Sequence, residues 1–317
     1  MRGQLNSIAF YLLAMALVVG LLVWGKPASV TGLFLVSGIA VGSLYSLGGI
    51  GLVVLYRATG VLNFAGGAVG ALGVMLAWQL GQWGWPEPVT WCAAIIVAAG
   101  LSLAYGRLVA PRLAWRDPVV KAVATLGFAL VVLGITAFLW EDDVRKFSLP
   151  TDAMAVSLLG LRVTVTRLIV VLGAIAIVSG IWAYLEYTRT GLQMRALANN
   201  RDLSAMLGVP VLHVETLAWA MAGVIAGFTG LMFGDLVRLE PTIITFLVIP
   251  CIAAAICGRL DSLFLVLIGG LSIGVIESLL TLSATLKSVR PLAPFVIAAI
   301  VLLWMQRNRR PLFEADQ

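Results

Sequence analysis

Long apolar runs alternate with short polar connections along almost the whole chain. Each run approaches the ~20 residues that an α-helix needs to cross a lipid bilayer, and glycine, proline or charged residues separate the runs. The pattern predicts an all-α integral membrane protein with a single transmembrane domain over residues 1–317 and about ten transmembrane helices. The predicted helices cover residues 8–24, 30–56, 61–80, 89–109, 119–140, 167–187, 211–237, 243–257, 263–281 and 291–304.

The charged residues predict how these helices are oriented. Lys and Arg in short loops are retained on the cytoplasmic side of a membrane. With ten helices and both termini inside, more than half of the 21 Lys and Arg residues fall in internal loops, and the acidic run 141–143 falls outside. Five helices per half would give the halves opposite orientations, so two five-helix inverted halves are a further expectation.

One polar connection, residues 189–210, has a more regular pattern than the others. It carries Arg189, Arg195 and Arg201, which predicts that it faces the cytoplasm. Its sequence predicts two short helices, the first capped by Thr190 and the second by Asn200. The second helix would have an apolar side at the spacing i, i+3, i+4. That side consists of Leu203, Met206 and Leu207.

The end of the same connection carries two stop signals. Gly208 stands where a helix end favours a left-handed residue, and Pro210 prevents the helix from continuing. A connection with caps and a stop is a folded element, which favours a docking site for a partner. A solvated loop between two membrane helices is the alternative. His213 and Glu215 follow directly, so we expect them at the cytoplasmic interface rather than in a proton relay.

Composition supports the membrane assignment and excludes several classes of function. The chain is 61% hydrophobic and 11% charged, with a mean hydropathy of +1.04, whereas a soluble domain is about one-quarter charged. The net charge of +6 lies in short loops and forms no basic face interleaved with aromatic residues, so no nucleic-acid partner is expected.

No arrangement of side chains suits bond-making chemistry or a metal site. His213 is the only histidine, and the three cysteines lie in apolar runs without a CxxC spacing. The segment from Gly20 to Lys26 resembles a phosphate-binding loop, but Pro27 replaces the required Ser or Thr. We therefore expect a protein that is not an enzyme, binds no cofactor and does not hydrolyse ATP itself.

Three stretches of the chain resemble one known family. The run Gly191-x-x-x-Arg195-Ala196-x-Ala198, followed by Asp202 and Gly208, is similar to the cytoplasmic coupling segment of permease subunits in ABC importers of the branched-chain amino acid type. The segments at residues 44–67 and 258–277 resemble the same family. Together these stretches span most of residues 40–280.

The resemblance implies a function and a set of partners. It implies a permease that works by alternating access in the bacterial inner membrane, surrounded by lipid, with two ATP-binding subunits that hold ATP and Mg²⁺. A second permease chain, identical or related, and an external solute-binding protein complete the expected assembly. The residues expected to couple the chain to the ATPases are Thr190, Gly191, Arg195, Ala196, Ala198, Asp202 and Gly208.

A second group of residues is expected to form the substrate pathway. It consists of Asn63, Phe64, Gly66, Gly67 and Glu277. Irregular backbone within a membrane persists only where protein or a water-filled cavity satisfies it, which favours the first four as pathway wall. The alternative for Asn63 is an amide that satisfies a broken helix. Glu277 either lines the pathway or is a buried acid bonded to a neighbouring helix.

The chain departs from the family pattern at two places. Gly66, Gly67 and Ala68 stand where the family usually has His-Gly-Glu, so two polar side chains are missing. Arg259 and Asp261 stand where the family tends to have glycine, and Phe264 stands where it tends to have proline. The expected substrate is a branched-chain amino acid or a related amide, urea or carboxylate. An ion-coupled secondary transporter and an integral membrane enzyme are the alternative functions.

Overall fold

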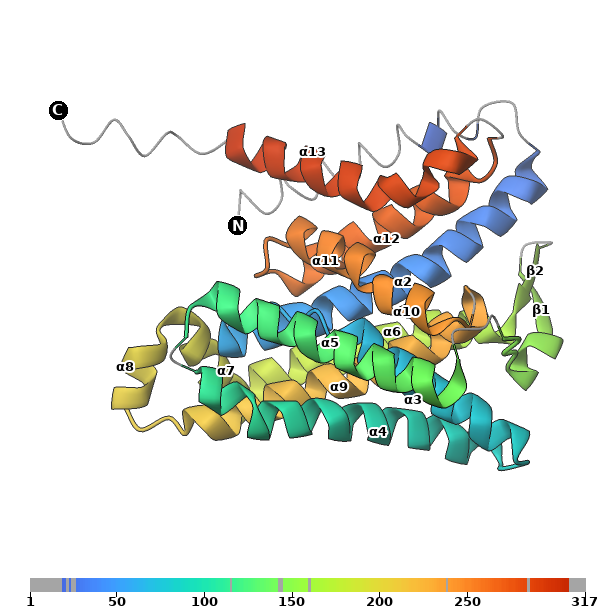
Figure 1. The fold of residues 1–317 in the computed structure, drawn as a ribbon. Coiled ribbons are helices and arrows are strands. Elements are labelled where there is room, and N and C mark those ends of the chain that lie inside the picture. Colours follow the sequence, from blue (N-terminus) through green and yellow to red (C-terminus); the bar gives the residue numbers. More distant parts are fainter. Residues whose placement is uncertain are drawn as a thin grey trace.

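The computed structural model describes residues 19–20, 23, 27–114, 116–141, 145–158, 161–237, 239–283 and 286–307. Within them the fold is a bundle of α-helices with one small β-hairpin (Figure 1). The longer helices are α2 (Ala28–Thr59), α3 (Gly66–Gln82), α4 (Glu87–Leu108), α5 (Pro118–Trp140), α6 (Val165–Tyr187), α7 (Arg189–Asn199), α9 (Val211–Leu236), α11 (Val248–Cys257), α12 (Leu263–Leu280) and α13 (Ala293–Arg307). The short helices are η1 (Ala110–Leu113), η2 (Pro150–Ala153), α8 (Arg201–Met206), α10 (Pro241–Phe246) and η3 (Lys287–Leu292), and the strands are β1 (Ala155–Leu158) and β2 (Leu161–Thr164).

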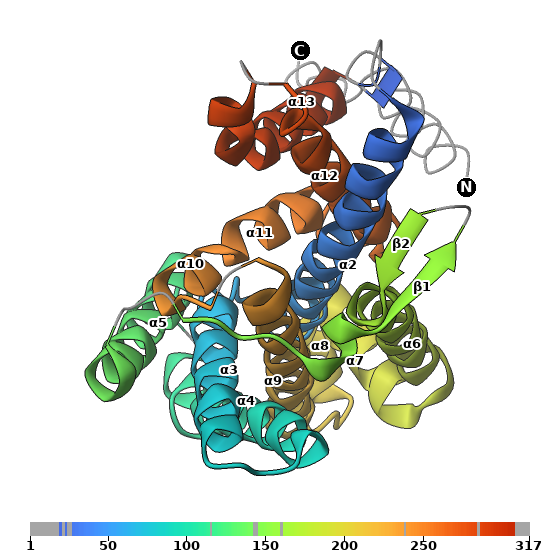
Figure 2. The same cartoon turned by 90° about the vertical axis from the view of Figure 1, so that its right-hand side faces the viewer.

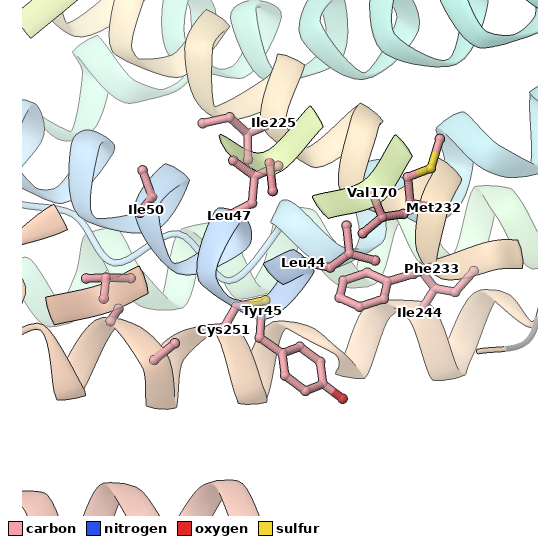
Figure 3. Packing of buried hydrophobic residues seen from close by; sticks show 14 of the residues in the cluster. Leu44, Tyr45, Leu47, Ile50, Val170, Ile225, Met232, Phe233, Ile244 and Cys251 are labelled. Carbon is pink, nitrogen blue, oxygen red and sulfur yellow. The ribbon is translucent and has the colours of Figure 1, made fainter. Parts of the chain in front are cut away.

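Two helices, α2 and α9, form the centre of the bundle. In their apolar windows 83% and 72% of the residues are buried inside the protein, against 22% for both α5 and α6. Helices α3, α4, α11 and α12 pack around this pair, and α5 and α6 lie further out (Figure 2). The main hydrophobic cluster joins α2 to α9, α10 and α11 through Leu44, Leu47, Ile225, Ile244 and Cys251 (Figure 3).

Glycines set the close crossing of α2 and α12. A Cβ atom on Gly42 would lie 2.9 Å from the carbonyl oxygen of Gly270, and one on Gly274 would overlap the backbone of Gly42. Lipid provides no hydrophobic force between helices, so close packing and small residues stabilise such contacts in a membrane. The glycine-rich pattern of this part of the sequence therefore reflects backbone-to-backbone contact.

The count of about ten transmembrane helices is not confirmed. Among the described residues, six helices are long and apolar enough to cross a membrane: α2, α4, α5, α6, α9 and α12. Helix α3 has 17 residues and α13 has 15. The first predicted helix, residues 8–24, lies outside the described residues except at positions 19, 20 and 23, as do Asp142 and Asp143 of the acidic run.

The single helix predicted over residues 243–257 is wrong. The segment consists of α10 and α11, which are separated at Leu247. Pro250 explains the break, because its ring excludes the carbonyl of the residue four positions earlier and it has no N–H to donate. That carbonyl belongs to Phe246, the last residue of α10.

The hairpin was not predicted either, since the sequence shows residues 141–166 only as a connection. Strands β1 and β2 are antiparallel, with Ala155 opposite Thr164 and Leu158 opposite Leu161. Figure 1 shows the hairpin at one end of the bundle and α7 with α8 at the other. We call these the hairpin end and the elbow end, where the elbow is the segment of residues 188–210.

Candidate coupling elbow and central cavity

The first helix of the elbow begins two residues earlier than the sequence suggests. Helix α7 starts at Arg189, and the side chain of Thr188 accepts a hydrogen bond from the backbone N–H of Gly191 at 3.0 Å. Thr188 is thus the cap, and the prediction that Thr190 caps this helix is wrong. The Thr190 hydroxyl instead donates to Tyr184 Oη at 2.6 Å, which ties the elbow to the end of α6.

The other local predictions for the elbow are confirmed. Asn200 Oδ1 accepts the N–H of Leu203 at 3.0 Å and caps α8. Gly208 has a φ of 84°, a left-handed conformation that favours glycine. Pro210 immediately precedes α9. The elbow is therefore a folded helix-turn-helix connection.

The elbow has one buried side and one exposed apolar side. Met194 and Leu197 of α7 are buried against α2, α6 and α9. On α8, by contrast, the predicted apolar side points away from the protein. Leu203 is 53% exposed, Met206 84% and Leu207 77%.

The residues of the family-like motif hold different positions in the elbow. Gly191 is buried so close to α6 that a Cβ would lie 2.6 Å from the Cα of Leu185. Arg195 pairs with Glu186 at 2.7 Å, and Ala196 is half-buried. Ala198, Asp202 and Gly208 are exposed. The motif thus combines one contact that fixes the elbow with several accessible positions.

A cavity of about 50 Å³ lies in the centre of the bundle. This volume has room for only a few water molecules and is too small for an amino acid. Among the residues expected in the pathway, Asn63, Gly66 and Gly67 line it, whereas Phe64 and Glu277 do not. The remaining lining residues are Gly48, Gly51, Leu52, Gly70, Ala222, Ile225, Ala226, Thr229, Gly230, Phe233, Ile244, Leu247, Val248 and Cys251.

The non-helical segment of residues 60–65 borders the cavity on one side, and we call it the floor segment. Asn63 lies within it and accepts the N–H of Ala65 at 2.9 Å, so its amide satisfies the broken helix and also borders the cavity. Thr125 of α5 holds the same segment. Its hydroxyl accepts the N–H of Phe64 at 3.1 Å and lies 3.1 Å from the carbonyl oxygen of Leu62.

Helix α3 begins at the cavity with two glycines that have different surroundings. A Cβ on Gly67 would overlap the carbonyl of Thr245 in α10, so only glycine fits there. A Cβ on Gly66 would meet no atom within 4 Å. A side chain at position 66, such as the family's histidine, would therefore have room beside the cavity, and its absence leaves that wall without a titratable group.

Glu277 is a buried acid with partners on two other elements. Tyr45 of α2 donates to its Oε2 at 2.8 Å, and Arg290 of η3 donates to its Oε1 at 3.0 Å. Tyr45 also packs against Phe233, with ring centroids 5.7 Å apart, and Figure 3 shows its hydroxyl pointing away from the labelled apolar residues. Since Phe233 lines the cavity, Glu277 stands behind the cavity wall.

Comparison with known proteins places this arrangement in a family. Residues 34–305 match the family model described as branched-chain amino acid transport system, permease component. The chain belongs to this permease family. It is a multi-pass membrane protein of that family, in keeping with the six long apolar helices in the part of the chain that the structure describes.

Individual permeases show the same similarity over most of the chain. A probable branched-chain amino acid transport permease, LivH of Methanocaldococcus jannaschii, is 27% identical over 73% of this chain and 75% of its own length. The high-affinity permeases BraD of Pseudomonas aeruginosa and LivH of Salmonella typhimurium are 24% and 25% identical. They cover 77% and 84% of this chain, and 84% and 92% of their own lengths.

The sequence of the permease did not predict the roles of several residues that the structure shows in contact. Thr188 lies only two positions from the expected cap, and both positions are threonine. Thr125 is 61 residues from Phe64, and Arg201 pairs with Glu215 across the turn that ends the elbow. No local pattern joins such partners, because a hydroxyl or a carboxylate beside a helix end looks the same with and without a partner.

Proposed function

We propose that this chain is the transmembrane permease of an ATP-driven importer. Its substrate would be a small polar metabolite, a branched-chain amino acid or a related amide, urea or carboxylate, moved by alternating access. The family supports the permease role, and the relatives named for branched-chain amino acid transport support the substrate class. This chain would bind no cofactor, and ATP and Mg²⁺ would be held by its partners.

The observation that carries the proposal is the exposed apolar side of α8. Leu203, Met206 and Leu207 lie on a capped helix beyond the ends of the long apolar helices. A surface of this kind fits a cleft in a partner protein. We propose that two ATP-binding subunits provide that cleft and that the elbow end faces the cytoplasm, together with both termini.

The rest of the assembly follows from the same proposal. A second permease chain, identical or related, would complete the membrane portion in the bacterial inner membrane. An external solute-binding protein would deliver the substrate at the hairpin end. The central cavity is too small for an amino acid, so transport requires the helices around it to separate. Movement of the elbow by the ATPases would drive that separation.

Met206→Glu and Leu203→Glu test the docking role directly. The full importer is purified through a tag on the permease, and the retained ATP-binding subunits are measured. We expect at least about a tenfold loss, because an unpaired carboxylate buried in an apolar contact costs more than ~1.4 kcal/mol. Val289→Glu is the control, since Val289 is 41% exposed on η3. Full retention in both test variants would refute docking through α8.

These positions give a sharper test than Arg195. The Arg195 guanidinium pairs with Glu186 at 2.7 Å and also contacts its backbone carbonyl. A charge reversal there would disturb the junction of α6 and α7 as well as any partner. A separate measurement addresses the ion-coupled alternative: the permease reconstituted alone should accumulate no solute under an ion gradient.

A further inference from the structure

We propose that the ion pair between Arg201 and Glu215 transmits the movement of the elbow to the walls of the central cavity. This makes the two residues positioning residues for transport. The inference rests on the proposed function, because it assumes that a partner moves α8. It adds the contacts through which movement of α8 reaches the walls of the central cavity.

One guanidinium group connects three parts of the protein. Arg201 is the first residue of α8, and its Nη2 lies 2.7 Å from Oε1 of Glu215 in α9. Its Nη1 lies 3.4 Å from the carbonyl oxygen of Ala114, in the connection that leads to α5. Lys121 of α5, Arg201 and Glu215 together line a small pocket. The elbow is therefore joined to α9 by the ion pair and, through Ala114, to the connection that leads into α5.

Burial makes this ion pair a firm connection. The side chain of Glu215 is 7% exposed and that of Arg201 is 25% exposed. Separating the pair would leave a carboxylate unpaired in a poorly solvated site, which is strongly unfavourable. The pair between Arg195 and Glu186 is different, because both side chains are at least 35% exposed and water can replace either partner. Helix α8 thus cannot move far without the start of α9.

The helices that follow these two contacts of Arg201, α9 and α5, both reach the central cavity or its floor segment. Helix α9 contributes six lining residues, beginning with Ala222, about two helical turns beyond Glu215. Helix α5 carries Thr125, one turn beyond Lys121, and Thr125 holds the floor segment through the N–H of Phe64. A displacement at Arg201 would shift one wall of the cavity and its floor together. That is the change needed to open the cavity toward the elbow end.

The test uses the complete importer in proteoliposomes with its ATP-binding subunits and solute-binding protein. The double variant Arg201→Gln/Glu215→Gln removes both charges, so no carboxylate is left unpaired. The docking residues Leu203, Met206 and Leu207 are unchanged in this variant, and the retained ATP-binding subunits and their basal ATP hydrolysis are measured alongside transport. Solute transported per ATP hydrolysed should fall at least about tenfold, within the range of ordinary coupling energies. Arg112→Gln, at an exposed arginine on η1, should keep the parental ratio.

An exchange of the two charges separates a transmitting role from a structural one. Arg201→Glu/Glu215→Arg restores an ion pair between the same positions, and we expect transport per ATP to return to within about threefold of the parent. The inference is overturned if the neutral pair keeps the parental ratio or if the exchanged pair recovers none of the loss. If the Arg201→Gln/Glu215→Gln variant does not assemble with its partners, transport per ATP in the Arg201→Glu/Glu215→Arg variant alone tests the inference.

The outcomes also distinguish this inference from the proposed function. If Met206→Glu and Leu203→Glu both keep their ATP-binding subunits, docking through α8 fails, whatever the ion pair does. If Met206→Glu releases the ATP-binding subunits and the Arg201→Gln/Glu215→Gln variant still transports as much solute per ATP as the parent, only the inference about Arg201 and Glu215 fails.

Discussion

Among the described residues, one buried carboxylate lies toward each end of the bundle, and the partners of these two carboxylates differ. At the elbow end Glu215 pairs with Arg201, which belongs to the segment proposed to contact another protein. Near the hairpin end Glu277 is bonded to Tyr45 and to Arg290. Glu277 therefore joins α12 to α2 and η3, whereas Glu215 joins α9 to the surface helix α8. We expect the first carboxylate to stabilise the fold and propose that the second transmits movement.

The largest effect on stability is expected when the elbow pair loses one partner only. Arg201→Met removes the cation that lies 2.7 Å from the buried Glu215 carboxylate and leaves only Lys121 in the same pocket, which should cost about 3 kcal/mol. The neutral double variant at the same two positions should cost much less. Thermal inactivation of the detergent-purified permease measures the difference. Equal stability of the single and double variants would show that water already solvates Glu215.

Removing the hydroxyl group at the other carboxylate should have a smaller effect. Tyr45→Phe keeps the ring contact with Phe233 but leaves Glu277 Oε2 without its donor, at a cost of about 1–2 kcal/mol. Tyr187→Phe is the matched control, because Tyr187 is 76% exposed. Transport per ATP should stay parental in both. A loss of coupling in Tyr45→Phe would remove the distinction between the two ends.

Glu277→Gln tests the pathway role that the sequence suggested for this residue. The amide oxygen still accepts from Tyr45, and the ion pair with a 40% exposed Arg290 side chain is lost. We expect a loss of about 1 kcal/mol in stability and an unchanged KM and substrate preference, because Glu277 lies behind the cavity wall. A shifted KM in uptake assays would instead place the carboxylate on the substrate's route.

The sequence predicts the long helices well because their apolar length is a local property. The predicted ranges 119–140, 211–237 and 263–281 agree with α5, α9 and α12 to within one residue at each end. The break before α11 was missed although Pro250 was visible, because the apolar run continues through it. The two strands of the hairpin have only four residues each, which is too short for their pattern to stand out from a loop.

The candidate site was predictable only where its parts are neighbours in the chain. Asn63, Gly66 and Gly67 form one polar and glycine-rich stretch, and all three line the cavity. Thr125 and the Arg201–Glu215 pair depend on contacts between distant segments, which composition and spacing do not encode. Glu277 was noticed as an acid in an apolar run, but its partners decide what it does.

The smallest predicted effect lies in the turn between α11 and α12, which borders the elbow. The family tends to have glycine at the positions of Arg259 and Asp261, but only Arg259 has a positive φ, of 59°. A left-handed conformation costs a non-glycine residue ~1–2 kcal/mol, and glycine loses ~0.5–1 kcal/mol more entropy on folding. Arg259→Gly should therefore stabilise the permease by about 0.5 kcal/mol.

Asp261→Gly is the matched control, and the opposite sign is expected there. Asp261 has no positive φ to relieve, and its carboxylate lies 3.6 Å from Arg57 at the end of α2. Glycine at this position adds entropy to the unfolded chain and removes the contact. Thermal inactivation should thus occur at a higher temperature in Arg259→Gly and at a lower one in Asp261→Gly. If both changes destabilised the protein, the arginine would contribute a contact worth more than its backbone strain. The turn between α11 and α12 would then be stabilised by a contact of the Arg259 side chain at the elbow end.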